Sequence, residues 1–328
     1  VFNGGRLIAN YSAAKADEDR ARAQYRGQED AIILQVVTAY AGTLYGEQAV
    51  AIRRDEVTRL QQEVDAANVR FEVGAATKTD VYQAEARLAA SRSDLAAAQA
   101  DLSSQRATYA RRVGAMPGTL DKPTAPAVPG AIEAAIDAGR AASPDIQAAE
   151  ASVKGAKART RAAYAGYLPS LSLTGSASRR GDDGFENFDN DSASLSARLS
   201  IPIWTGGRTT AATAQAKAQE RGAKFSLDDT VRATDEETTQ AWARLDAAKL
   251  RAEASRAQLE AASFAAKGAA LERREGLRTQ LELLDQIQEE RNAALAVAAA
   301  ERDVLTSSYQ LLQAIGQVPR PANAPQPK

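Results

Sequence analysis

The fold is decided by residues 208–273, which read RTTAATAQAKAQERGAKFSLDDTVRATDEETTQAWARLDAAKLRAEASRAQLEAASFAAKGAALER. Most of these residues are Ala, Leu, Glu, Gln, Arg or Lys, the strongest helix formers, and two isolated glycines are the only breakers. A helix of about 66 residues is roughly 100 Å long, because each residue adds about 1.5 Å. An ordinary globular domain needs no rod of that length.

The rod turns back on itself after residue 274. Glu275-Gly276-Leu277 interrupts the helical pattern, and a glycine at this place supplies the positive backbone torsion that ends many helices. Thr279 followed three residues later by Glu282 is a capping box, which predicts a return helix running to about Ile315. Because residues 203–318 contain no proline, this part of the chain is predicted to be one long helical hairpin.

The chain is an internal duplication, because residues 1–117 repeat as residues 203–319 without gaps. Matching landmarks are Gly4-Gly5-Arg6 with Gly206-Gly207-Arg208, Tyr40 with Trp242, Gly74 with Gly276, Thr77 with Thr279, and Pro117 with Pro319. The first copy therefore predicts a helix over about 7–72 and a return helix over about 79–113. Apolar residues recur every seven positions on both helices, which indicates an antiparallel coiled coil. These residues are Val50, Val57, Val64 and Phe71, then Val81, Leu88, Leu95, Leu102 and Tyr109.

Between the repeats, the sequence predicts a connector, a short helix and a strand pair. Residues 192–203 alternate strictly between apolar and small polar side chains, and residues 170–177 alternate similarly, with a polar loop over 179–190 between them. Strands of this kind are typical of a transmembrane barrel, with Tyr164, Tyr167 and Trp204 as an interfacial girdle, or of a half-buried hairpin in a soluble sandwich. The duplication also predicts that a helix and two strands, roughly 60 or more residues, precede Val1 in the natural protein.

We divide the chain accordingly. The predicted parts are a strand end and first hairpin (1–115), a connector (116–142), a short stacking helix (143–167), a β-hairpin (168–204), a second hairpin (205–318) and a disordered tail (319–328).

Composition excludes several classes of function. The net charge of -1 and pI of about 5.9 offer no basic surface for nucleic acid. Cysteine and histidine are absent, which removes thiol nucleophiles, imidazole bases and zinc fingers. No run of 18 apolar residues predicts a membrane helix. We therefore predict no catalytic residues, no metal site, no cofactor and no enzymatic activity.

The order of these elements resembles the TolC family of outer-membrane efflux and secretion channels across essentially the whole chain. The likeness rests on the duplicated unit, the two Gly-Gly-Arg junctions, the helix start Ser143-Pro144-Asp145, the lead Tyr164-Ala165-Gly166-Tyr167-Leu168-Pro169 into a strand, and the hairpin tips. It implies a mainly α fold in which long hairpins form an α-barrel, joined to a β-hairpin that contributes to a trimeric β-barrel. It also implies a homotrimer in the outer membrane of a Gram-negative bacterium, with most of the chain in the periplasm, acting as the exit duct of a tripartite efflux or type I secretion system. The implied partners are a periplasmic adaptor, an inner-membrane transporter of the ABC or RND type reached through that adaptor, and lipid around the β-barrel.

The resemblance assigns the functional residues to the two tips. It implies that Glu282 and Asp285 form the pore constriction, and that Arg278 with Thr79 and Asp80 latches neighbouring tips together. Residues three apart share a helix face, so a trimer would direct six carboxylates at its axis, favour cations and raise the pKa of each carboxyl group. The latch tyrosine of the family is replaced by Arg273. Adaptor contact is implied for the residues around the tip glycines, which are Val73, Gly74, Ala75, Ala76, Thr77, Glu275, Gly276, Leu277 and Thr279.

Other interpretations remain open from the residues alone. Thr77 with Asp80, and Thr279 with Glu282, are capping boxes that any helical hairpin would use, whereas Asp285 has no capping role. The chain could be a periplasmic adaptor with a helical hairpin, although adaptors flank one hairpin with compact β modules. It could also be a structural coiled-coil protein. The sequence does not indicate whether drugs, metals or proteins pass through.

Overall fold

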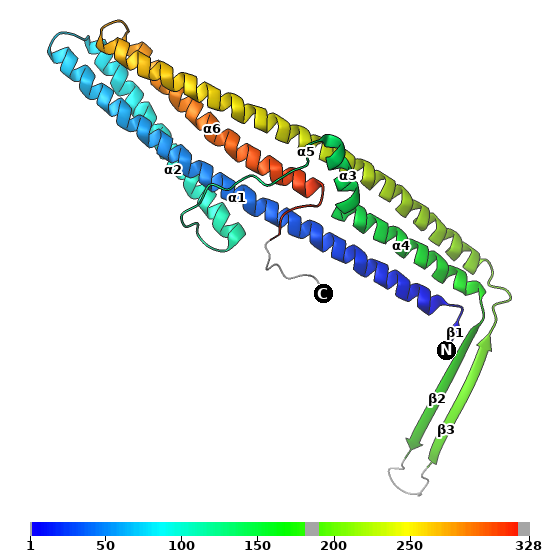
Figure 1. Cartoon of the computed structure of the whole chain (residues 1–328). Helices are drawn as coiled ribbons and strands as arrows, with labels where there is room; N and C mark the ends of the chain where they lie inside the picture. The colour runs from blue at the N-terminus through cyan, green and yellow to red at the C-terminus, as the bar shows by residue number, and fades with distance from the viewer. Residues whose placement is uncertain (1, 181–189, 321–328) are drawn as a thin grey trace. The chain divides into compact units, whose positions relative to one another are not determined.

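The computed structural model describes residues 2–180 and 190–320 and confirms a mainly helical chain with long antiparallel hairpins (Figure 1). The elements are β1 (Phe2–Asn3), α1 (Arg6–Glu72), α2 (Lys78–Val113), α3 (Ile132–Ala142), α4 (Pro144–Tyr164), the 3-10 helix η1 (Ala165–Tyr167), β2 (Ser170–Arg180), β3 (Asn190–Ser200), α5 (Arg208–Arg274) and α6 (Gln280–Ala314). The two rods α1 and α5 have 67 residues each, so each is about 100 Å long.

The strands differ from the prediction at both ends. Arg179 and Asn190, expected in the loop, belong to β2 and β3, and β3 ends at Ser200 rather than at Ile203. Pro202 explains this end, because proline has no N–H to donate to a strand ladder. The centre of the predicted loop, residues 181–189, and most of the tail predicted to be disordered, residues 321–328, lie outside the described residues.

The described chain forms two compact units, and each contains parts of both repeats. Unit 1 contains residues 2–27 and 142–234, and unit 2 contains residues 28–141 and 235–320. Both rods run through both units. The two repeats are therefore divisions of the sequence, whereas each compact unit groups residues of both repeats that pack together.

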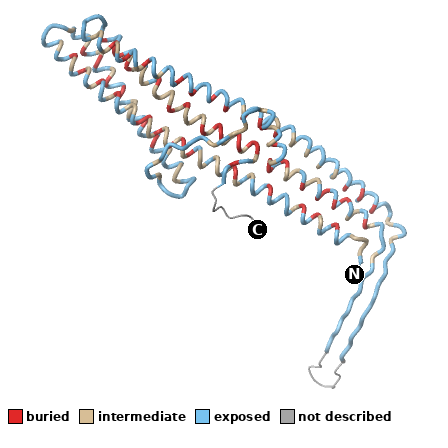
Figure 2. Tube along the Cα trace, viewed as in Figure 1, coloured by how far each residue is buried: buried red, intermediate tan, exposed pale blue. Residues whose placement is uncertain are grey.

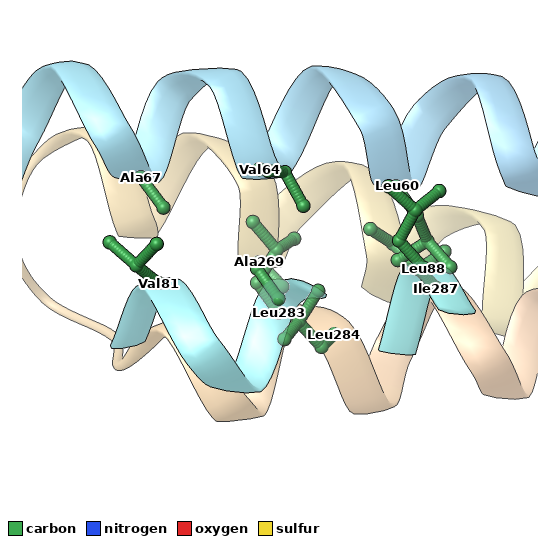
Figure 3. Close-up of a cluster of buried hydrophobic side chains, with 10 residues drawn as sticks. Leu60, Val64, Ala67, Val81, Leu88, Ala269, Leu283, Leu284 and Ile287 are labelled. Atoms are coloured by element: carbon green, nitrogen blue, oxygen red, sulfur yellow. The ribbon is translucent and has the colours of Figure 1, made fainter. Parts of the chain in front are cut away.

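Unit 2 has an apolar core next to the hairpin tips, where α1, α2, α5 and α6 meet (Figure 3). The predicted heptad residues Val64, Val81 and Leu88 lie in this core. Phe71, the last predicted heptad residue of α1, is instead 45% exposed, because the helix ends one residue later. A second core joins α3, α5 and α6 around Ala135, Leu245 and Ile315.

A charge network crosses unit 2 where α1, α2 and α6 pack together. Arg291 Nη1 lies 3.1 Å from both the Glu56 and the Asp94 carboxylates, and Arg53 lies 2.8 Å from Asp94. The Glu56 side chain is only 5% exposed and that of Arg291 only 13%. Burial raises the pKa of Glu56, and the Arg291 guanidinium opposes this shift only in part.

Unit 1 packs α1, α4 and α5 closely through small side chains. The buried residues include Ala9, Ala13, Ala16, Ala151, Ala156, Ala158 and Ala216. Thr160 Oγ1 donates to the Ala216 carbonyl oxygen at 3.2 Å, which fixes α4 against α5. Ser143 is the N-cap of α4 as predicted, but its side chain makes no capping hydrogen bond.

The three strands of unit 1 form one antiparallel sheet in the order β1-β2-β3. Leu171 pairs with Leu199 and Leu173 with Ala197, so apolar residues of both long strands lie on one face. Serine pairs lie on the other face, where Ser176 and Ser194 are hydrogen-bonded at 2.9 Å. Figure 2 shows the described part of this ribbon as exposed, and Leu195 and Leu199 are 76% and 63% exposed. Nothing in the described chain covers the apolar face, so the half-buried sandwich interpretation is not supported.

None of the helices in the described ranges carries an apolar stretch long enough to cross a bilayer.

Candidate functional site: the two hairpin tips

The two tips share one backbone design. In the first tip, the Gly74 N–H donates to the Phe71 carbonyl at 3.0 Å, and the Ala75 N–H donates to the Arg70 carbonyl at 2.7 Å. In the second tip, Gly276 and Leu277 make the equivalent bonds at 3.2 and 2.8 Å. This is the Schellman pattern, which requires a positive φ at its glycine. Gly74 and Gly276 have φ values of 74° and 76°.

Both return helices begin with the predicted capping boxes. Asp80 Oδ2 accepts from the Thr77 backbone N–H and hydroxyl at 2.9 Å each. Glu282 Oε2 accepts from the same two groups of Thr279 at 2.8 and 2.9 Å. The backbone hydrogen bonds, followed by the hydroxyl bonds, lower the pKa of Asp80 and of Glu282. Within one chain, Glu282 therefore serves as a cap, and the hydrogen bonds from Thr279 favour its carboxylate form.

Asp285, which follows Glu282 by three residues on α6, is half-exposed and has a partner that the sequence analysis missed. Arg87 of α2 lies 2.8 Å from Asp285 Oδ1, and its guanidinium also donates to Gln288. An exposed pair of this kind contributes at most about 1 kcal/mol. Arg87 and Asp285 are 198 residues apart in the sequence, so helical spacing could not predict their contact.

Arg278, expected in a latch, pairs with Glu272 of its own hairpin. Among the described contacts of this single chain, no hydrogen bond or ion pair joins Arg278 to Thr79 or Asp80. Thr79 is exposed beside the capping box. The structure thus places all three residues at the tips without bringing them together within one chain.

Gln280 connects the two hairpins behind the tips. It is 2% exposed, and its side chain accepts from Arg70 Nη1 at 3.1 Å and donates to Glu63 at 3.3 Å. Arg273, which stands where the resemblance implies a tyrosine, is partly buried near Arg70, and both burial and Arg70 lower its pKa. The sequence analysis did not single out Gln280. One signal could have found it, because Gln280 stands three positions before the buried Leu283 and therefore shares its face of α6.

The residues predicted to contact an adaptor surround two open glycines. A Cβ added at Gly74 or at Gly276 would meet no atom within 4 Å, so another chain could approach the backbone at either place. Val73 and Leu277 beside them are 74% and 76% exposed. Ala75, Thr77, Glu275 and Thr279 are also exposed, and Ala76 is half-buried.

No group of three or more His, Cys, Asp or Glu residues that could hold a metal ion occurs within residues 2–180 and 190–320.

Comparison with known proteins relates the whole arrangement to one family. The model of the outer membrane efflux protein family matches residues 1–115 and 135–317. The chain is 33% identical over 320 residues to the outer membrane efflux protein BepC of Brucella suis biovar 1 (strain 1330), covering 97% of this chain and 70% of that protein. It is 28% identical over 315 residues to the outer membrane protein TolC of Vibrio cholerae, covering 90% and 70%. It is 24% identical over 297 residues to the alkaline protease secretion protein AprF of Pseudomonas aeruginosa, covering 88% and 62%.

Solved structures show the same fold. The structure of CusC has a TM-score of 0.82 at 19% identity and covers 95% of this chain and 74% of that one. The open state of the MtrE outer membrane channel of Neisseria gonorrhoeae has a TM-score of 0.81 at 22% identity, with coverage of 96% and 73%. At these identities the likeness concerns the fold alone.

Proposed function

This chain belongs to the outer membrane efflux protein family, and we propose that it is the exit duct of a tripartite efflux or type I secretion system. Members of the family serve as such ducts and are not enzymes, and its relatives point to the outer membrane of Gram-negative bacteria. In this proposal the duct is a homotrimer that passes solutes or polypeptide outward. A periplasmic adaptor and an inner-membrane transporter supply the other two parts, and the helices occupy the periplasm.

One observation carries the proposal. The ribbon aligns its leucines on one uncovered face and its serines on the other, and a long hairpin follows it directly. Lipid would cover these exposed apolar strand residues in a transmembrane barrel, and the polar face would then line a water-filled lumen. The alternative of an adaptor lacks comparable support, because the described residues contain one three-stranded sheet and no compact β module.

The tips would close the duct. Asp285 and Glu282 lie three residues apart on α6, so three chains would bring six carboxylates towards one axis. Arg87 neutralises part of that charge in the conformation described here, since it pairs with Asp285. Arg278, Thr79 and Asp80 remain candidates for a latch between chains, and the exposed residues around Gly74 and Gly276 for adaptor contact.

Reconstitution in planar bilayers tests this function and the constriction together. We expect the trimer to conduct ions with a preference for cations. Asp285→Asn should reduce that preference, and Arg87→Gln should increase it, because the two substitutions remove opposite charges from one ion pair. Unchanged selectivity in Asp285→Asn would remove Asp285 from the constriction, and a protein that inserts without conducting would refute the duct.

A further inference from the structure

The strand-side ends of the three long helices in unit 1 carry positive charge without acidic residues in the same segments. No Asp or Glu occurs in residues 2–16, 151–180 or 192–219. We name five exposed cations of these segments, on α1, α4 and α5, the cationic collar. The collar consists of Arg6, Lys15, Arg161, Arg208 and Lys217. Lys157 of α4 is left out, because it lies close enough to Glu220 to lower the pKa of that carboxyl group.

Contacts within unit 1 bring the collar-bearing segments together at the end where the strands begin. The Tyr167 hydroxyl is hydrogen-bonded to Thr210 Oγ1 at 3.0 Å, so the end of α4 lies beside the start of α5. Lys217 Nζ lies 5.1 Å from the centre of the Tyr164 ring. A Cβ at Gly4 would lie 2.9 Å from the Ala165 carbonyl oxygen, which places the start of α1 at the same end.

Three acidic residues that border these segments in the sequence are paired with other cations. Asp17 is paired with Arg159 at 2.5 Å, Glu220 with Lys224 at 2.8 Å, and Asp191 with Arg179 at 3.5 Å. Within the described part of the chain, none of the five collar cations forms an ion pair with a carboxylate. Five cations without carboxylate partners at one end repel each other, which favours an anionic partner.

The size of the collar fits the headgroup region of a bilayer. Nine residues separate Arg6 from Lys15 and Arg208 from Lys217, which corresponds to about 14 Å of helix. Headgroups add about 5–8 Å to each side of the hydrocarbon core. A further Debye length of about 8 Å brings the collar members farthest from the strands within reach of charged headgroups. Exposed Trp204 lies between the strand ribbon and Arg208, and exposed Leu7 and Ile8 follow Arg6 directly on α1.

We propose that the cationic collar binds the anionic headgroups of glycerophospholipids in the leaflet that the strand ribbon enters. This inference rests on the proposed function, because it takes the strands to span a membrane. The collar would set the depth of the protein in the membrane and concentrate anionic lipid around it. Each lysine or arginine near an anionic surface strengthens such binding by up to about fivefold.

Fluorescence of Trp204 tests the proposal, because this residue is 87% exposed and follows the strand ribbon directly. The chain has two tryptophans, so Trp242→Phe makes Trp204 the only one. The Trp242→Phe protein is reconstituted in phosphatidylcholine vesicles that contain equal fractions of either brominated phosphatidylglycerol or brominated phosphatidylcholine. We expect brominated phosphatidylglycerol to quench Trp204 more strongly, and we expect added sodium chloride to remove the difference.

A charge variant and a matched control locate the effect. In the test variant, Gln replaces Arg6, Arg161, Arg208 and Lys217. In the control, Gln replaces four exposed cations of unit 2, which are Arg54, Arg244, Lys249 and Lys267. The preference for phosphatidylglycerol should be lost in the test variant, by up to about fivefold for each collar cation removed, and stay unchanged in the control. Equal quenching by the two lipids in the Trp242→Phe protein, at any salt concentration, would overturn the proposal.

Two further measurements separate the remaining explanations. Inorganic phosphate should reduce the preference no more than chloride of equal ionic strength, and a specific effect of phosphate would show that the collar binds a free anion instead. If the test variant changes ion selectivity but not lipid preference, the collar lines the water path and the proposal fails. Conductance in phosphatidylcholine alone reports on the proposed duct independently, because it needs no anionic lipid.

Discussion

The buried pair Glu56–Arg291 gives the sharpest prediction about stability, because its two members should respond differently to substitution. Glu56 is 5% exposed and Arg291 13%. Removing one partner of a buried pair typically costs about 3–5 kcal/mol, because the other charge is left unpaired. Arg291→Met leaves the Glu56 carboxylate in that condition, so we expect a loss of about 3 kcal/mol in the free energy of unfolding at neutral pH.

Glu56→Gln should cost much less. Desolvation outweighs the attraction of Arg291, so the ionised Glu56 carboxylate is unfavourable in the folded protein. Arg291 also keeps Asp94 at 3.1 Å after the substitution. We therefore expect Glu56→Gln to change stability by less than about 1 kcal/mol, and the double variant Glu56→Gln, Arg291→Met to recover much of the loss.

The pH dependence follows from the sign of the shift. Because the folded pKa of Glu56 is raised, its contribution to stability is fully present below the unfolded pKa and is lost as the pH rises through the folded pKa. The stability of Glu56→Gln relative to the natural sequence should therefore rise between mildly acidic and neutral pH. The loss of stability in Arg291→Met should become smaller on acidification, since Glu56 then takes up a proton.

Circular dichroism at 222 nm during heating in detergent measures the apparent melting midpoint of each variant, which ranks the variants by thermal stability. At about 2–4 °C per kcal/mol, Arg291→Met should lower the apparent midpoint by roughly 6–12 °C. Midpoints are compared at one scan rate, because unfolding of such assemblies is often irreversible. If Glu56→Gln lowers the midpoint as much as Arg291→Met does, the ion pair is net stabilising and the reasoning is wrong.

Three further predictions concern the tips. Thr77→Ala removes the cap of α2 and should destabilise it by about 1 kcal/mol, whereas Thr79→Ala, which leaves the cap intact, should have little effect in the same melting assay. The capping bond lowers the pKa of Asp80, so its stabilisation is present above the unfolded pKa and is lost as the pH falls through the folded pKa. The difference in stability between Thr77→Ala and the natural sequence should therefore become smaller in acid. Gly276→Ala should cost about 1 kcal/mol because of its positive φ, whereas Gly268→Ala inside α5 should not destabilise, and equal costs would contradict the Schellman assignment. Since the chain has no cysteine, Val73→Cys and Leu277→Cys provide single sites for cross-linking to an adaptor, and we expect products there but not with the distant Lys249→Cys.

The fold could be predicted because its signals are local or repeated. Helix-forming residues, the two capping boxes and the tip glycines each act within a few positions, and the duplication supplied every signal twice. Alternation predicted the strands as well, but the end of β3 depended on Pro202, which lies within the alternating stretch and stops the ladder.

The charge contacts could not be predicted, because they join residues far apart in the chain. Asp285 was identified as a carboxylate without a cap, but its partner Arg87 belongs to the other hairpin. Gln280 received no prediction from the sequence, although it is buried and connects Arg70 with Glu63. Such contacts depend on how the helices rotate against each other, which heptad spacing fixes only for apolar positions.

The net charge of -1 conceals a separation of charge along the chain that bears on function. The strand-side segments contain cations without a single carboxylate, whereas residues 272–285 at the second tip contain three arginines and the four carboxylates of Glu272, Glu275, Glu282 and Asp285. A uniform mixture of the same residues would serve solubility equally well, so the separation calls for a different cause in each region. Carboxylates near a constriction select the ions that pass, and cations beside the strands meet anionic headgroups. Exchanging the charges of the collar should therefore change lipid preference while leaving ion selectivity at the tips unaffected.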